Sequence, residues 1–161
     1  MVEQRSLPEI VKRHFAPMLQ MLREIVETCP DELFNQPELC VREHVYHVLV
    51  GMDVWLSPDP MAYPFDQIVD DDAAEFRGPA SGKISRRFLL DYLGRIEAKV
   101  AGLPDQTEAY LTIHEMRGRE FTLLDRCLGQ FRHTQHHIGV INEKLRAHGS
   151  EAMDWRGWGE D

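Results

Sequence analysis

The sequence has few cysteines and fewer basic than acidic residues. Its three cysteines, Cys29, Cys40 and Cys127, are odd in number, and no two have the C-x-x-C spacing. We therefore expect no disulfide framework, and the predicted compartment is the reducing cytoplasm. The 18 Lys and Arg are outnumbered by 27 Asp and Glu, which gives a formal net charge of -9. An acidic chain repels phosphate backbones, so nucleic acid is not an expected partner.

Long apolar runs are also missing. The most apolar stretch, residues 45–56, is too short to span a bilayer and contains His47 and Asp53. The first six residues carry no apolar core of the secretory kind, so we expect no secretory signal. No membrane partner is therefore predicted. A length of 161 residues fits a single domain, 1–161, that can bury a hydrophobic core.

Apolar residues recur at spacings of three and four, which predicts four long helices. We place them at residues 8–28, 38–56, 85–101 and 119–148. Ser6 and Glu9 have the spacing of a capping box before the first helix, and Gly149 suits the left-handed position after the last. Residues 57–84 form a long connection that we interpret as a cover over a site.

This helix order predicts an all-α fold, a four-helix bundle with a long crossover between the second and third helices. For residues 105–118 the sequence is compatible with either an extended chain or a turn of helix. The tail, with Trp155 and Trp158, is expected to lie as a strap against the bundle.

Two of the eight histidines, His133 and His137, have a spacing that suits a metal site. Residues four apart lie one above the other on a helix face, so two imidazoles can point at one ion. The pair flanks the apolar stripe of the last helix, where a ligand from another helix can reach it. H-x-x-x-H alone is weak evidence, because polar pairs at this spacing are common.

The second predicted helix supplies a third ligand. His47 lies in an otherwise apolar segment, where a histidine needs a hydrogen-bond partner or a metal. A backbone carbonyl or Asp53 could satisfy it instead, and Asp53 could also orient a ligand imidazole. His44, one turn earlier, is the alternative third ligand, and His136 is the alternative on the last helix.

Other metal and cofactor sites fit less well. A zincin requires glutamate directly after its first histidine, where this chain has Thr134. Ferritin-like di-iron bundles require Glu-x-x-His on two helices, and no histidine here has glutamate three residues before it. Haem held by bundle histidines is a third interpretation, which predicts a Soret band in the purified protein.

Two segments resemble motifs of the DinB/YfiT-like superfamily: His133-Thr134-Gln135-His136-His137-Ile138-Gly139 followed by Asn142, Leu145-Arg146 and Gly149, and His44-Val45-Tyr46-His47 leading to Asp53 and Trp55. The resemblance implies a four-helix bundle with an unusual crossover. It also implies three histidines that bind nickel, zinc or another divalent transition metal and leave coordination positions open. Carried over residue by residue, these ligands are His47, His133 and His137. The motif can also be aligned so that His44 takes the place of His47.

The same resemblance implies two kinds of function. The family includes enzymes that use low-molecular-weight thiols, the mycothiol-dependent isomerases and bacillithiol transferases. We therefore expect a metal-dependent thiol S-transferase or a hydrolase that acts on a small-molecule substrate. Other members have no known reaction, and some are induced by DNA damage. The alternative is a non-catalytic metal-binding or dimeric interaction module of a stress response, and a homodimer is expected.

Overall fold

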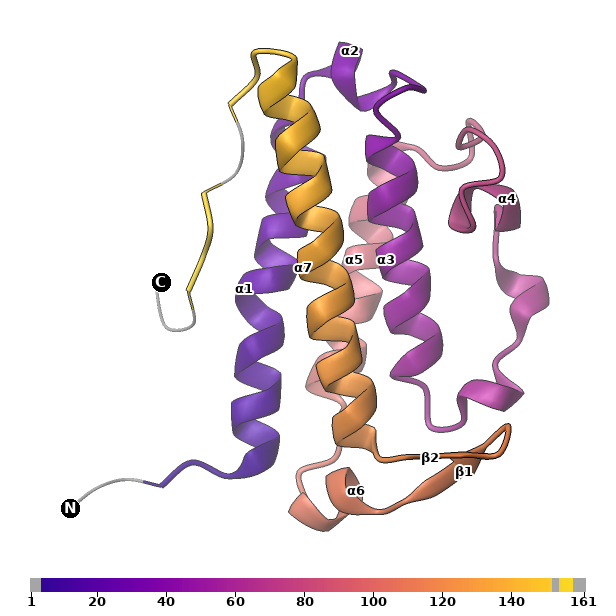
Figure 1. The fold of residues 1–161 in the computed structure, drawn as a ribbon, viewed down its shortest axis with the longest axis vertical. Helices are drawn as coiled ribbons and strands as arrows, with labels where there is room; N and C mark the ends of the chain where they lie inside the picture. Colours follow the sequence, from indigo (N-terminus) through magenta and orange to yellow (C-terminus); the bar gives the residue numbers. More distant parts are fainter. Residues whose placement is uncertain (1–3, 152–153, 158–161) are drawn as a thin grey trace.

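The computed structural model describes residues 4–151 and 154–157, and within them the chain is mostly helical with one small sheet (Figure 1). Its helices and strands are α1 (Leu7–Thr28), α2 (Asp31–Phe34), α3 (Val41–Trp55), the 3-10 turns η1 (Pro60–Ala62) and η2 (Phe65–Gln67), α4 (Asp71–Ala74), α5 (Arg86–Ala101), α6 (Thr107–Leu111), β1 (His114–Met116), β2 (Arg119–Phe121) and α7 (Leu123–Ala147). The expectation of a predominantly α-helical protein is confirmed.

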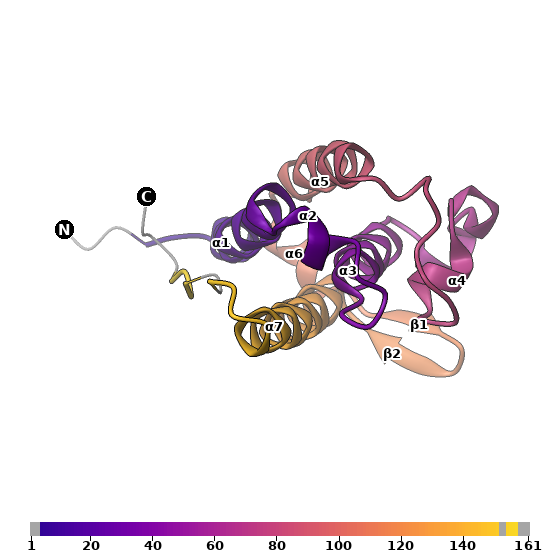
Figure 2. The same cartoon turned by 90° about the horizontal axis from the view of Figure 1, so that it is seen from above.

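Four long helices, α1, α3, α5 and α7, lie side by side. Each of α1 and α3 packs against both α5 and α7, and the view from above shows α1 and α3 on opposite sides (Figure 2). Their facing surfaces form the core, which contains the fully buried side chains of Phe15, Leu22, Leu49, Met52 and Leu93. The helices are thus held together by the apolar stripes that the spacing of three and four predicts.

The directions of the long helices explain why the connection between α3 and α5 is long. Arg86 at the start of α5 donates to the Cys29 carbonyl after α1 at 2.8 Å, so α5 is antiparallel to α1. Lys99 and Asp53 form an ion pair near the ends of α5 and α3, so these two helices are parallel. Residues 56–85 must therefore return the chain along α3, about 22 Å for its 15 residues.

The connection is fixed to α3 by polar contacts. The Tyr46 hydroxyl accepts a hydrogen bond from the Asp70 backbone N–H at 3.1 Å. The buried Glu43 carboxylate accepts one from the Ala80 N–H, and Arg42 donates to the Ala80 carbonyl at 3.2 Å. These three side chains come from the first two turns of α3, so they hold the second half of the connection at the start of this helix, and Figure 1 shows the connection beside α3.

The first and third predicted helices match α1 and α5 to within one residue at each end. The capping box of Ser6 and Glu9 is present, and Gly149 has a φ of 73°. The prediction that the second helix starts at residue 38 was wrong. Cys40 has a left-handed φ of 53°, so α3 starts at Val41.

The predicted start of the last helix at residue 119 was also wrong. Residues 114–121 form a hairpin, β1 paired antiparallel with β2, whose turn residues Arg117 and Gly118 have φ values of 52° and 72°. The helix α7 begins only after Thr122, whose hydroxyl forms a capping box with Asp125. Residues 105–118 therefore contain both a short helix, α6, and the first strand.

Asp53 does not orient a histidine. Its carboxylate accepts hydrogen bonds from the Tyr63 hydroxyl at 2.8 Å, the Tyr92 hydroxyl at 2.9 Å and the Lys99 ammonium. Burial alone would raise the pKa of Asp53, but the hydrogen bonds from Lys99 and Tyr63 outweigh it and keep the pKa below its ordinary value. Asp53 therefore links α3, α5 and the connection as a charged structural residue.

The tail contacts the helices through a charged side chain. Arg156 donates to the Glu24 carboxylate of α1 at 2.8 Å. Trp155 is 70% exposed, so it does not pack against the helices as expected. Trp158 lies outside the described residues. Within the described ranges, no helix has the combined length and apolar character needed to cross a membrane.

We predict that Asp53→Ala lowers the free energy of unfolding by about 2–3 kcal/mol, because it leaves the buried Tyr92 hydroxyl and Lys99 without their acceptor. Urea unfolding followed by circular dichroism measures the change. The matched control is Asp91→Ala, which removes an exposed partner of Arg87 at 3.9 Å and should cost less than about 0.5 kcal/mol. Equal losses in the two variants would contradict the role given to Asp53.

Candidate metal centre

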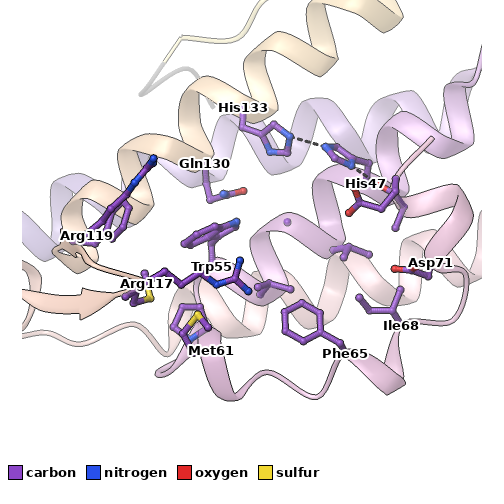
Figure 3. A pocket seen from close by; sticks show the side chains of 18 residues that line it. His47, Trp55, Met61, Phe65, Ile68, Asp71, Arg117, Arg119, Gln130 and His133 are labelled. Atoms are coloured by element: carbon purple, nitrogen blue, oxygen red, sulfur yellow. Dashed lines mark hydrogen bonds between the residues drawn. The ribbon is translucent and has the colours of Figure 1, made fainter. Parts of the chain in front are cut away.

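Three histidine side chains from two helices converge at one point between α3 and α7. The Nε2 atom of His133 lies 2.8 Å from Nε2 of His47 and 3.1 Å from Nε2 of His137 (Figure 3 shows the first contact). One ring nitrogen from each of the three histidines lies within 4.8 Å of the other two. The three side chains are therefore close enough to hold a metal ion.

These separations fit the donor spacing of a metal site. Two nitrogens bound to one ion at 2.0–2.1 Å lie about 2.9 Å apart at a right angle and about 3.3 Å apart at the tetrahedral angle. The two measured separations fall close to this range. Only small side-chain movements would bring all three nitrogens to bonding distance of a common centre.

The hydrogen bonds around His47 leave its Nε2 free to donate a lone pair. Its Nδ1 faces the Ala74 carbonyl oxygen, which can only accept, so Nδ1 carries the proton. Nε2 of His133 meets two other ring nitrogens, and one proton cannot satisfy both contacts. A cation at the same point would accept all three lone pairs, so the donor set fits a metal.

His44 and His136 lie outside this group. His44 is buried behind His137, and the Nδ1 atoms of the two rings are 2.8 Å apart. Nε2 of His44 lies 3.3 Å from the Lys144 ammonium. His136 is exposed, and only its ring edge meets His137, at a centroid distance of 5.2 Å. The geometry thus groups His47, and not His44, with the two histidines of α7.

Burial keeps the ring nitrogens neutral. Together with the weaker effect of the neighbouring histidines, it lowers the pKa of His133 to about 4 and that of His137 to about 3. Burial and then the Lys144 charge lower the pKa of His44 to about 4. Neutral imidazole is the form that binds a metal, so His133 and His137 are ready to bind one at neutral pH.

Phe76 covers the cluster, and the sequence analysis missed it. Its ring centroid lies 4.8 Å from His44 and 5.0 Å from His47, and its ring stacks on His137 at 5.9 Å. Phe76 has a left-handed φ of 54°, which places the ring over the histidines from the end of α4. No pattern predicts this, because a single aromatic residue in a long connection has no periodic partner.

A cavity of about 790 Å³ opens beside the histidines. Its walls come from α3, α7, the connection and the hairpin, and His47 and His133 lie at one side of it (Figure 3). Trp55, Met61 and Phe65 give it apolar walls. The volume is within the range of small-molecule sites, roughly 300–1,000 Å³.

The function has to be inferred from this geometry, because no family model, no curated protein and no solved structure matches the chain. Three neutral nitrogen donors leave a divalent ion its full positive charge, and one side of the group faces a cavity. Such an arrangement can bind a small molecule next to a Lewis acid.

We predict that the metal-free protein loses stability as the pH falls from about 6.5 toward 4. An unfolded histidine has a pKa near 6.5, whereas folding holds those of His44, His133 and His137 at about 4, 4 and 3. The unfolded chain therefore binds more protons in this window, and protonation favours unfolding. Urea titrations of chelator-treated protein at several pH values measure the slope. His137→Gln should reduce the slope of the free energy of unfolding against pH. An unchanged slope in this variant would contradict the lowered pKa of His137.

Proposed function

We propose that this chain is a metalloprotein in which His47, His133 and His137 bind one divalent transition metal ion. The convergence of three ring nitrogens beside a cavity carries this proposal. Imidazole donors suit nickel and zinc, and these are the metals we propose. The Ala74 carbonyl would fix the tautomer of His47, as outer hydrogen bonds commonly do for metal-binding histidines.

We further propose that the fold is a four-helix bundle of the DinB/YfiT-like type. Four long helices that pack around a common core support the bundle. The parallel pair α3 and α5, joined by a long connection, supports the unusual crossover. The order of the ligands along the chain, one histidine on the second long helix and two on the last, also agrees with the resemblance of the motifs.

The proposed reaction is metal-dependent thiol transfer or hydrolysis of a small molecule. A divalent ion with open positions lowers the pKa of a bound thiol or water and so supplies a nucleophile at neutral pH. The chain's own part is to hold three neutral donors in place, and Phe76 shields them on one side. His47 and His133 line the cavity, so a substrate there would lie next to the ion.

We predict that the purified, untagged protein contains about one equivalent of a transition metal, and that His47→Ala and His133→Ala each lose it. Elemental analysis measures the content. His136→Ala is the matched control, because this exposed neighbour lies outside the group and should leave the content unchanged. Metal retained in His47→Ala but lost in His44→Ala would move the third ligand to His44. A wild type that takes up neither zinc nor nickel would refute the proposal.

We also predict that Gly51→Ala weakens metal binding about tenfold to a hundredfold, the effect typical of disturbing the groups that orient a metal ligand. A Cβ at Gly51 would lie 3.3 Å from Cε1 of His133 and 3.4 Å from Oε1 of Gln130, so the ligand ring would have to move. Competition with a chromogenic chelator measures the affinity. Gly94→Ala, also inside a helix but with open space around its Cβ, should bind metal as the wild type does. Equal affinities in both variants would contradict the expected displacement.

A non-catalytic, dimeric metal-binding module is the second candidate. The exposed Trp155 and the exposed Ile113 favour it, because large apolar side chains at the surface can serve self-association. Turnover that disappears on chelation and returns with zinc or nickel would favour the enzyme. Metal binding without turnover, together with a dimer that dissociates when the chain is truncated before Ser150, would favour the module.

A further inference from the structure

The hairpin separates its charges by face. Met116 pairs with Arg119, and the next pair, Glu115 with Glu120, points to the opposite side of the two strands. Met116, Arg119 and Phe121 line the cavity, together with Arg117 from the turn, whereas neither glutamate does. The strand alternation thus places Arg119 on the cavity side and the two glutamates on the other side, and the turn adds Arg117 to the cavity lining.

Stability alone does not explain this arrangement. Glu115 and Glu120 lie directly opposite each other, a like-charge pairing that destabilises a hairpin. Arg117 has a left-handed φ of 52° in a turn where asparagine or glycine would fit with less strain. The glutamate pair keeps negative charge off the cavity side of the hairpin, and the left-handed turn residue adds an arginine there.

The two arginines have no acidic partner among residues 4–151 and 154–157. The cavity contains two carboxylates, Asp71 and Glu75, and both belong to the connection. Asp71 is already paired with Arg77. Glu75 directly follows Ala74, which contacts His47, so it lies at the histidine end. In Figure 3, Arg117 and Arg119 lie at the hairpin side of the cavity and Asp71 at the opposite side.

The cavity therefore has two different ends and an apolar middle. Arg117 and Arg119 form one end, and His47 and His133 lie at the other. The side chains of Trp55, Met61 and Phe65 form its apolar walls. A planar guanidinium with several donors favours a carboxylate, which it can bind through two parallel hydrogen bonds.

We propose that Arg117 and Arg119 bind the carboxylate of a small organic substrate whose apolar part lies against Trp55, Met61 and Phe65. The opposite end of this substrate faces His47 and His133. The orientation toward the histidines rests on the proposed metal function, whereas recognition of the carboxylate by the hairpin does not require a metal.

The test uses the full chain and a pair of probes of nearly equal shape, the anion 4-phenylbutyrate and the neutral 4-phenylbutanamide. Isothermal titration calorimetry is run on the protein as purified and again after chelation, because a carboxylate can also bind a metal. We expect the wild type to bind 4-phenylbutyrate about tenfold more tightly than the amide in both preparations, as a charge-assisted guanidinium contact would give. The double variant Arg117→Gln/Arg119→Gln should bind the two probes equally.

Arg87→Gln is the matched control, because Arg87 is an exposed arginine on α5 away from the cavity. It should retain the preference for the anion. Equal binding of both probes by the wild type, or a preference that survives in the double variant, would overturn the inference. Elemental analysis of the same preparations tests the metal proposal separately. A protein that contains no metal as purified and takes up neither zinc nor nickel, but still prefers 4-phenylbutyrate, would keep the hairpin site and refute only the metal site.

Discussion

Two cationic side chains of α7 fix how this helix lies against α3. The Arg126 guanidinium donates to the carbonyls of Trp55 and Ser57, at 3.1 and 2.8 Å, and so caps the end of α3. Lys144 donates to the Leu39 carbonyl at 2.8 Å, before the other end of the same helix. A slip of one turn, about 5.4 Å, would break both contacts and separate His47 from the histidines of α7. The geometry of the candidate site depends on this register.

The sequence predicted the parts of the fold that depend on local signals. Apolar spacing and the capping box of Ser6 and Glu9 placed the first helix, and apolar spacing placed the third within one residue of α5. The hairpin also had a local signal that was not used. Thr122 and Asp125 have the spacing of a capping box, and Gly118 suits a tight turn, so a strand pair before residue 122 could have been predicted. The helical spacing of the following residues concealed it.

The part of the candidate site that lies within one helix could be predicted, and the part that depends on packing between helices could not. The spacing of His133 and His137 is a property of one helix and can be read from the sequence. The choice between His44 and His47 depends on how two helices pack, because both lie on the inward side of α3. Asp53 illustrates the same limit, since its partners Tyr92 and Lys99 come from a distant helix. The cover supplied by Phe76 follows from a left-handed backbone conformation that its side chain does not favour.

The separation of the candidate ligands along the chain has a consequence for folding. His47 and His133 are 86 residues apart, and an ion held between them would act as a reversible cross-link. A cross-link restricts the unfolded chain more strongly as the loop it closes grows, and for covalent bridges the effect reaches roughly 4–5 kcal/mol near 100 residues. An ion bound here would therefore lower the entropy of the unfolded state as well as prepare a reaction centre. The resistance of the chain to unfolding would then depend on the metal supply of its surroundings.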